Sequence, residues 1–283
     1  MDDRARTIDI ERAELAEFGA IPSVPEYLRE LWRRREYAVA VPMGDLRAMH
    51  MNTVLGNLWH LINPLLMVGV YYLVFGLILD TTRGIDNFIT FLAVGIFTFR
   101  FTQNSIQRGA STIVANDGLI RSIYFPRAIL PLATVVEQVV LLGPVFVVTF
   151  VILLLTGESP SVTWLLLPIV YALQSLFNLG GAFVAARITD SFKDFQNVVP
   201  FVFRIIFYLS GVLYSVEAFI DDPTLLRLFE LNPAFCFVTM ARWTVLDTPL
   251  PLGALVSAII WSLALLVGGF LFFRAAEPRY GRG

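Results

Sequence analysis

The chain has 283 residues, of which 57% are hydrophobic and only 16% are charged. A soluble domain usually has about a quarter of its residues charged, so this composition excludes an ordinary water-soluble protein. The net charge of −2 gives no positive field of the kind that nucleic-acid-binding proteins carry, and no nucleic-acid partner is expected. The composition therefore predicts an all-α integral membrane protein that contacts membrane lipids.

The N-terminal part of the chain divides into two predicted segments. Residues 1–24 are polar and contain no apolar signal-peptide core, so they are expected to form a mobile cytoplasmic leader. Residues 25–57 are predicted to form an amphipathic segment at the cytoplasmic membrane surface, because Leu28, Leu31 and Trp32 recur at helical spacing beside Arg33. This helix is either a surface anchor, or it cradles a partner protein or gates a lateral entry.

Six stretches are apolar and long enough to cross the bilayer, which takes about 20 residues of helix. Together they predict a six-span transmembrane domain over residues 58–274, followed by a cytoplasmic tail at 275–283. The predicted spans are 59–79, 88–107, 129–155, 164–187, 198–214 and 252–273.

The orientation of the spans follows from the positions of the 21 Lys and Arg residues. Sixteen of them precede the first span, follow the last, or lie in the second-to-third and fourth-to-fifth loops. Basic residues gather on the cytoplasmic side of a membrane protein, so both termini are predicted to be cytoplasmic.

The loop between the second and third spans is predicted to dock on another protein. It contains a helix-competent stretch at 111–115, a break at 116–118, and then apolar and basic residues in alternation. A loop with this pattern lies outside the lipid, so its apolar residues need protein contacts. The residues selected for this surface are Ser111, Asn116, Asp117, Leu119, Ile120 and Arg121.

Two short helices are predicted on the outer side, between the fifth and sixth spans. The first covers 223–230 and the second 233–246, and each begins at a proline. Both are too short to span the bilayer but apolar enough to re-enter it when backed by protein.

Arg100, Glu137 and Arg204 fall in the interior of predicted spans, whereas Arg187 is the last residue of its span. A charge at that depth has to face protein or water. Either Glu137 forms a structural pair with an arginine, or the arginines contact a polar substrate or its phosphate. The predicted substrate path comprises Arg100, Arg204, Phe97, Phe101, Tyr72, Phe207 and Tyr208.

Catalytic signatures are missing from the sequence. Lys193 is the sole lysine and has no glycine near it, so the chain has no phosphate-binding loop for ATP. Cys236 is the sole cysteine, and His50 and His60 are the sole histidines. No metal site, catalytic residue or cofactor is expected in this chain, and it is not expected to be an enzyme.

Several motifs occur in an order that resembles the type-2 ABC permeases, in the branch that exports polysaccharides and polyol phosphates. Taken together they cover roughly residues 25–275. The motifs are Leu55-Gly56-Asn57-Leu58-Trp59 with Pro64 and Val74-Phe75-Gly76, then Leu119-Ile120-Arg121 with Phe125-Pro126-Arg127, and finally Leu231-Asn232-Pro233.

The resemblance implies a homodimer of this chain with two copies of a separate ATPase subunit, in the bacterial plasma membrane. The partner subunit would bind ATP and Mg, and the 111–124 loop would be the coupling helix. The substrate would be a glycan linked to a polyprenyl diphosphate lipid, with a cell-wall galactan as the most specific expectation.

Two alternatives stay open from the sequence. One is a drug or lipid exporter with the same fold. The other is a membrane enzyme that acts on polyprenyl lipids, for which Asp190 and Asp194 form an acidic pair near a span end.

Overall fold

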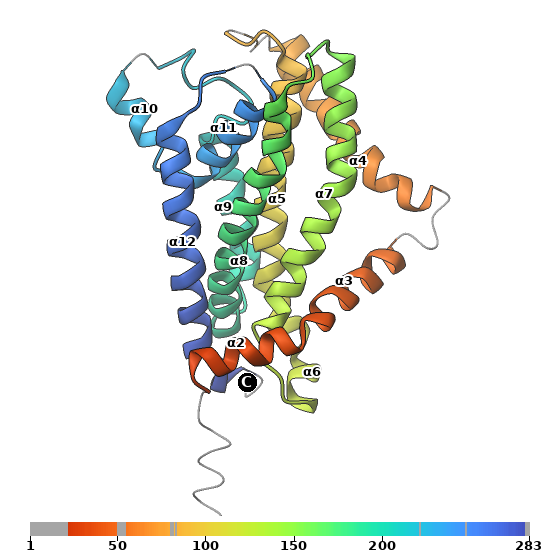
Figure 1. The fold of residues 1–283 in the computed structure, drawn as a ribbon, viewed down its shortest axis with the longest axis vertical. Helices are drawn as coiled ribbons and strands as arrows, with labels where there is room; N and C mark the ends of the chain where they lie inside the picture. Colours follow the sequence, from red (N-terminus) through yellow and green to blue (C-terminus); the bar gives the residue numbers. More distant parts are fainter. Residues whose placement is uncertain are drawn as a thin grey trace, which may run out of the picture.

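The computed structural model describes residues 22–49, 55–79, 82, 84–220, 222–246 and 248–280. The regular structure within these ranges is helical and contains no strand, which confirms the predicted all-α class. The long helices form an elongated bundle with short helices at both ends (Figure 1). They are α4 (Trp59–Tyr71, continued by a π-helical stretch at Tyr72–Ile78), α5 (Phe88–Ala115), α7 (Ile129–Leu155), α8 (Leu167–Ser191, after a 3-10 turn at Val162–Leu166), α9 (Phe195–Leu209) and α12 (Leu252–Ala275).

The short helices mark the two ends of the bundle. One end, called here the α6 end, also carries the C-terminal turn, and the opposite end is called the α10 end (Figure 1). The short helices are α2 (Val24–Arg33), α3 (Arg35–Met49), α6 (Asp117–Ser122), α10 (Pro223–Phe229) and α11 (Pro233–Val245), and 3-10 turns lie at Gly56–Leu58 and Glu277–Arg279.

Four helices in the described part of the chain are long and apolar enough to cross a membrane. They cover Trp59–Ile78, Ile129–Leu155, Val162–Ser191 and Leu252–Ala275. The predicted spans 88–107 and 198–214 lie in α5 and α9. The first is interrupted by polar residues, and the second belongs to a helix of only 15 residues.

Two helix ends differ from the ends of the predicted spans. The helix-competent stretch 111–115 is helical and continues α5 to Ala115, beyond the predicted span end at 107, and the Ser111 and Thr112 hydroxyls donate to carbonyls of the same helix. Helix α9, which corresponds to the predicted fifth span, ends at Leu209, five residues before the predicted end at 214. The reason is that Gly211 adopts a φ of +58° and turns the chain.

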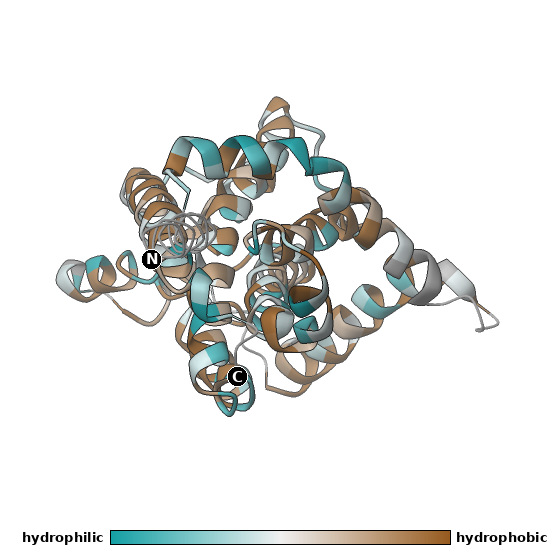
Figure 2. Cartoon of the chain, turned by 90° about the horizontal axis from the view of Figure 1, so that it is seen from below, coloured by the Kyte–Doolittle hydropathy of each residue, from teal (hydrophilic) through white to brown (hydrophobic). Residues whose placement is uncertain are grey.

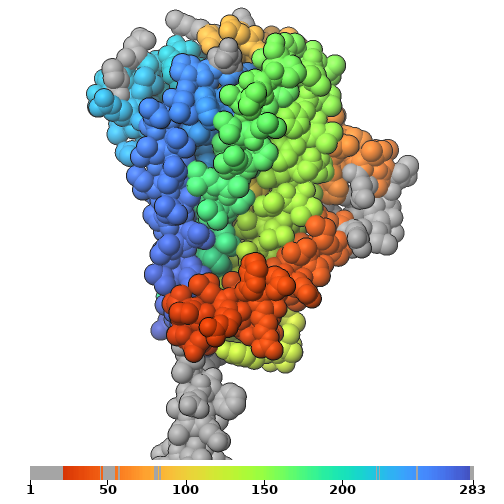
Figure 3. Space-filling view, viewed as in Figure 1, coloured from red at the N-terminus to blue at the C-terminus, as the bar shows by residue number. Residues whose placement is uncertain are grey.

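Helix α2 lies across the bundle at the α6 end, as the ribbon and the space-filling view both show (Figures 1 and 3). Seen from that end, α2 is the most continuous hydrophilic stretch among brown, apolar helices (Figure 2). Its first turn is fixed by Glu26, whose carboxylate accepts from the Ser23 N–H at 3.0 Å and the Ser23 hydroxyl at 2.7 Å. Arg34 separates α2 from α3, so the amphipathic segment is two helices.

Helix α5 is held in the centre of the bundle by a polar seam with α8. Gln174 donates to the Thr98 carbonyl at 2.8 Å and to the Thr102 hydroxyl at 2.7 Å. The hydroxyls of Thr98 and Tyr171 lie 3.0 Å apart. These side chains are buried, and their hydrogen bonds offset the cost of removing them from water.

Helices α8 and α12 touch through their backbones. A Cβ atom added to Gly269 would lie 2.4 Å from the Gly180 carbonyl oxygen, and one added to Gly180 would lie 2.3 Å from Leu265 backbone atoms. Small residues allow helices in a membrane to approach in this way and to gain close packing.

We expect the substitution Gly269→Ala to push α8 and α12 apart and to lower stability by about 1–3 kcal/mol. The matched control is Gly268→Ala, because a Cβ at Gly268 meets nothing within 4 Å. Thermal unfolding in detergent should show a lower Tm for the first variant only. Equal Tm values for the two variants would show that the backbone contact contributes little.

Candidate functional site

A cleft of about 240 Å³ lies between α4, α5 and α7. It contains one of the two predicted intramembrane arginines, Arg100, near the middle of α5. Asn104 follows Arg100 by one helical turn on the same face of α5. The remaining lining residues are Trp59, His60, Asn63, Pro64 and Met67 of α4, Phe97 and Phe101 of α5, and Gln138, Leu141, Leu142 and Val145 of α7.

Two side chains leave hydrogen-bond donors unused in this cleft. Arg100 is half-buried and makes no hydrogen bond or ion pair with the described residues. Gln138 is 3% exposed, and its Nε2 atom has no hydrogen-bond partner among the residues that the structure describes. No Asp or Glu is among the described residues that line the cleft. Unpaired buried donors are costly, so this arrangement favours an anionic or oxygen-rich ligand.

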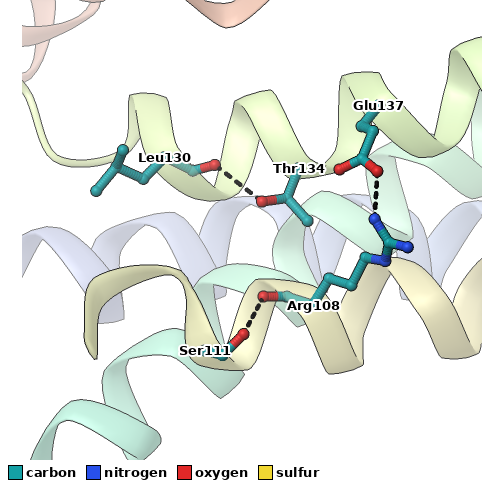
Figure 4. Close-up of polar contacts among 5 residues, drawn as sticks. All are labelled: Arg108, Ser111, Leu130, Thr134 and Glu137. Carbon is teal, nitrogen blue, oxygen red and sulfur yellow. Dashed lines mark hydrogen bonds and ion pairs between the residues drawn. The ribbon is translucent and has the colours of Figure 1, made fainter. Parts of the chain in front are cut away.

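Glu137 does not neutralise Arg100. Its buried carboxylate forms an ion pair with Arg108, two turns further along α5 (Figure 4). The structural pair that we considered for Glu137 is therefore present, but its partner is an arginine outside the predicted spans. The cleft keeps the positive charge of Arg100.

The predicted substrate-path residues fall into three separate places. Phe97 and Phe101 line the cleft with Arg100. Tyr72 lies elsewhere, at the end of α4, with its ring centroid 6.5 Å from that of Phe88.

The third place is α9. Phe207 is buried there, 5.0 Å from the ring of Phe99 in an edge-on contact, so it belongs to the core. Arg204 and Tyr208 are exposed on the surface of the same helix that faces away from the bundle. The Arg204 guanidinium carbon lies 5.6 Å from the centroid of the Phe201 ring.

The residues selected for the docking loop lie at the α6 end. Ile120 is buried, Leu119 is partly buried, and Asp117 and Arg121 form an exposed ion pair at 2.9 Å. Asn116 begins α6 and donates to the Thr112 carbonyl at 2.8 Å, while Ser111 belongs to the last turn of α5.

The exposed apolar side chains of this loop are Ile123 and Tyr124, and Tyr124 is 74% exposed. These two residues were not among those selected from the sequence. They could have been, because two apolar residues directly after Ser122, in a loop outside the predicted spans, indicate a protein contact.

The gate-helix residues lie on both faces of α2. Leu31 packs partly against the core, whereas Leu28, Trp32 and Arg33 are exposed, Trp32 by 70%. The deeply buried residue of this helix is Tyr27, which the sequence reasoning missed. Tyr27 precedes Leu31 by one helical turn, and this spacing was the available signal.

Glu277 joins three segments of the chain at the α6 end. Its Oε1 atom accepts from the Tyr27 hydroxyl at 3.0 Å and from the Arg127 N–H at 2.9 Å. The Tyr27 oxygen in turn accepts from the Ala128 N–H at 3.1 Å. We call these four residues the Glu277 junction; it connects α2, the segment after α6, and the turn after α12.

The pKa of the Glu277 carboxyl is raised above its ordinary value. Burial raises the pKa of Glu277, while the hydrogen bonds from Arg127 and Tyr27 and the charges of Arg127 and Arg274 act in the opposite direction. A neutral side chain with an oxygen acceptor should therefore be tolerated at this position.

The α10 end has a second cavity, of about 520 Å³, with the carboxylates of Asp86, Glu158 and Glu217 in its lining. Arg242 of α11 also lines it and was not among the residues selected from the sequence. Its guanidinium donates to the carbonyls of Phe91, Gly211 and Val212 at 3.2, 2.9 and 2.7 Å. Arg242 therefore ties α11 to α5 and to the turn after α9.

We expect Glu277→Ala to release α2, because the buried Tyr27 hydroxyl and Arg127 N–H lose their acceptor, at a cost of about 1–3 kcal/mol. Hydrogen exchange should become faster in residues 24–33 and 125–128. Glu277→Gln should have a smaller effect, because the amide keeps an acceptor oxygen. The exposed neighbour Arg279 provides the control variant, Arg279→Ala. Unchanged exchange in Glu277→Ala would show that other contacts hold α2.

Comparison of the sequence with known proteins identifies several similar proteins. The O-antigen export system permease protein RfbA of Myxococcus xanthus is 27% identical over 224 residues, which cover 79% of this chain and 85% of that protein. RfbA of Klebsiella pneumoniae is 28% identical over 180 residues, covering 63% and 69% of the two chains. The polysialic acid transport protein KpsM of Escherichia coli is 22% identical over 244 residues, covering 84% and 92%.

A family model also matches the chain. It describes the ABC-2 type transporters and matches residues 43–246, from α3 to the residue after α11. This match covers well over half of the 283 residues. The chain therefore belongs to the ABC-2 type transporter family.

Proposed function

We propose that this chain is the membrane permease subunit of a bacterial ABC exporter that moves a lipid-linked polysaccharide across the plasma membrane. The observation that carries this proposal is its similarity, over most of its length, to permeases for O-antigen and polysialic acid. The Arg100 cleft agrees with it, because an uncompensated cation favours an anionic substrate over an apolar drug. A cell-wall galactan is the specific glycan that we expect.

In this proposal the bundle crosses the membrane six times, with both termini in the cytoplasm. α4, α7, α8 and α12 are apolar enough to do so by themselves. α5 is supported by its burial among other helices, and α9 by its apolar composition. The α6 end is then cytoplasmic, and α10 and α11 re-enter the membrane from the outer side, with Arg242 anchoring α11 from within.

The exposed face of α9 supports a homodimer. Phe201, Ile205 and Tyr208 are exposed there together with Arg204. A guanidinium at membrane depth is costly against lipid, so this face needs a protein or aqueous neighbour. A second copy of the chain would provide one, with the glycan path between the two copies.

A separate ATPase subunit, in two copies, would supply the energy, since the sequence contains no phosphate-binding loop. ATP and Mg would bind to that subunit. Its docking surface on this chain is α6 together with Ile123 and Tyr124, which present exposed apolar side chains at the α6 end.

Motion of α6 would reach the gate helix through the Glu277 junction. This junction hydrogen-bonds the segment after α6 to Tyr27 of α2. ATP binding in the partner can drive transport only if the two states of the permease differ in such contacts. The gate at α2 and the docking helix would therefore move together.

Deletion of the gene in its native host tests the proposed function. Lipid-linked polysaccharide should accumulate inside the cell and disappear from the cell surface, and the wild-type gene should restore export. Surface labelling of the glycan together with extraction of the lipid-linked pool would measure both effects. Normal surface glycan in the deletion strain would contradict the proposal.

The docking surface is tested by Tyr124→Asp, which places a charge on its exposed aromatic residue. Co-purification of the ATPase subunit with the permease should fall about tenfold, the loss expected when an interface aromatic is truncated or charged. Phe219→Asp is the matched control, because Phe219 is an exposed aromatic far along the chain from α6. Equal recovery of the ATPase with both variants would place the docking surface elsewhere.

A further inference from the structure

An apolar groove of about 600 Å³ runs between α3, the start of α4 and α7. It lies on the outside of the bundle, where α3 rises beside α7 (Figures 1 and 3). Leu46 belongs to α3, Leu58 to the 3-10 turn before α4, and Leu61 to α4. The α7 wall is formed by Val140, Pro144 and Val147. His60 is the one ionisable residue among the described lining residues.

This groove is adjacent to the Arg100 cleft. His60 and Leu141 line both spaces, so they form the boundary between them. On one side of the boundary lie the unpaired donors of Arg100 and Gln138. On the other side the walls are aliphatic.

A single ligand that fills both spaces must combine two chemistries. It needs an anionic group with several acceptor oxygens, because the Arg100 guanidinium offers a planar fork of donors and the Gln138 amide adds another. It also needs a hydrocarbon chain for the groove. A lipid with a phosphate-bearing headgroup has both parts.

The position of Arg100 along α5 helps to decide whether the lipid is a permanent membrane lipid or a transported one. Arg100 lies 12 residues from the Phe88 end of α5 and 15 residues from the Ala115 end, which is about 18 Å and about 22 Å along the helix axis. The headgroup of a membrane phospholipid stays at the bilayer surface. A headgroup halfway along α5 belongs to a molecule that the protein carries across.

We propose that the Arg100 cleft and the groove together hold the polyprenyl diphosphate anchor of the substrate. The diphosphate accepts hydrogen bonds from Arg100 and Gln138, and the isoprenoid chain leaves past His60 and Leu141 into the groove. This inference deepens the proposed function and rests on it. It separates the lipid anchor from the glycan, which needs a different, aqueous path.

The test uses the full-length chain in nanodiscs of phosphatidylcholine, with sugar-free polyprenyl diphosphate as the probe and native mass spectrometry as the readout. Arg100→Ala should weaken binding about tenfold, the effect of losing a hydrogen bond to a charged group. Arg100→Lys keeps the charge and should recover part of the affinity. Arg227→Ala is the control, since Arg227 is exposed on α10 and does not line the cleft or the groove.

The groove is tested separately. Val147→Trp should obstruct the chain-binding part and weaken polyprenyl diphosphate without changing the binding of inorganic diphosphate. Val151→Trp is the matched control, because Val151 is exposed one turn further along α7 and does not line the groove.

Three results would overturn the inference. They are unchanged binding in Arg100→Ala, unchanged binding in Val147→Trp, and equally tight binding of phosphatidylglycerol, which would make this a general anionic-lipid site. Failure of the proposed function can be distinguished from failure of this inference. If only the proposed function is wrong, the gene deletion leaves surface glycan normal, while polyprenyl diphosphate binding still depends on Arg100.

Discussion

The hydrogen bonds between Gln174 of α8 and the Thr98 and Thr102 positions of α5 are the interaction on which the rest of the bundle depends. They allow a helix with a polar face to stand in the centre of an apolar protein. α7 and α8 pack on α5, α12 packs on α8 through Gly180 and Gly269, and α11 is tied to α5 by Arg242. Loss of the seam would therefore disturb every one of these contacts.

The two polar faces of α5 serve different purposes. Towards α8 the Gln174 amide nitrogen and the hydroxyls of Thr98, Thr102 and Tyr171 are paired, while the Gln174 Oε1 atom has no partner among the described residues. Towards α4 and α7, Arg100 and the Gln138 amide nitrogen are without partners among the described residues. An unpaired buried cation lowers stability, and in the proposed function it is explained by a ligand that is present for part of the transport cycle. Helix α5 thus combines a structural face with a functional one.

The sequence predicted the helical class and the places of the long helices, because runs of apolar residues determine both. Prediction of the third span was accurate to the residue, since Ile129–Leu155 is predominantly apolar between polar flanks, despite Glu137 and Gln138 in its middle. The ends of α5 and α9 were less predictable, because they depend on hydroxyl-to-carbonyl bonds at Ser111 and Thr112 and on the backbone turn at Gly211. Hydropathy contains no information on these local interactions.

For the site, residue type identified Arg100 but could not identify its neighbours. A charge inside a span can be recognised from the sequence alone. The pairing of Glu137 with Arg108 rather than Arg100 depends on how α5 and α7 face each other. The same limit applies to the aromatic residues of α9, because adjacent positions on a helix point in different directions: Phe207 is buried, whereas Tyr208 is exposed. Glu277 was missed because its partners, Tyr27 and Arg127, are 250 and 150 residues away.

The polarity of α5 has a consequence for biogenesis. A helix that lacks enough apolarity to enter lipid by itself must be retained near the insertion machinery until its partners arrive. The Thr98 carbonyl and the Thr102 hydroxyl of α5 accept hydrogen bonds from Gln174, which is synthesised more than 70 residues later. During synthesis α5 therefore remains unsatisfied until α8 has emerged from the ribosome. With the proposed six-span topology, membrane integration of this protein is then a cooperative event that involves the first four long helices, rather than a series of independent insertions.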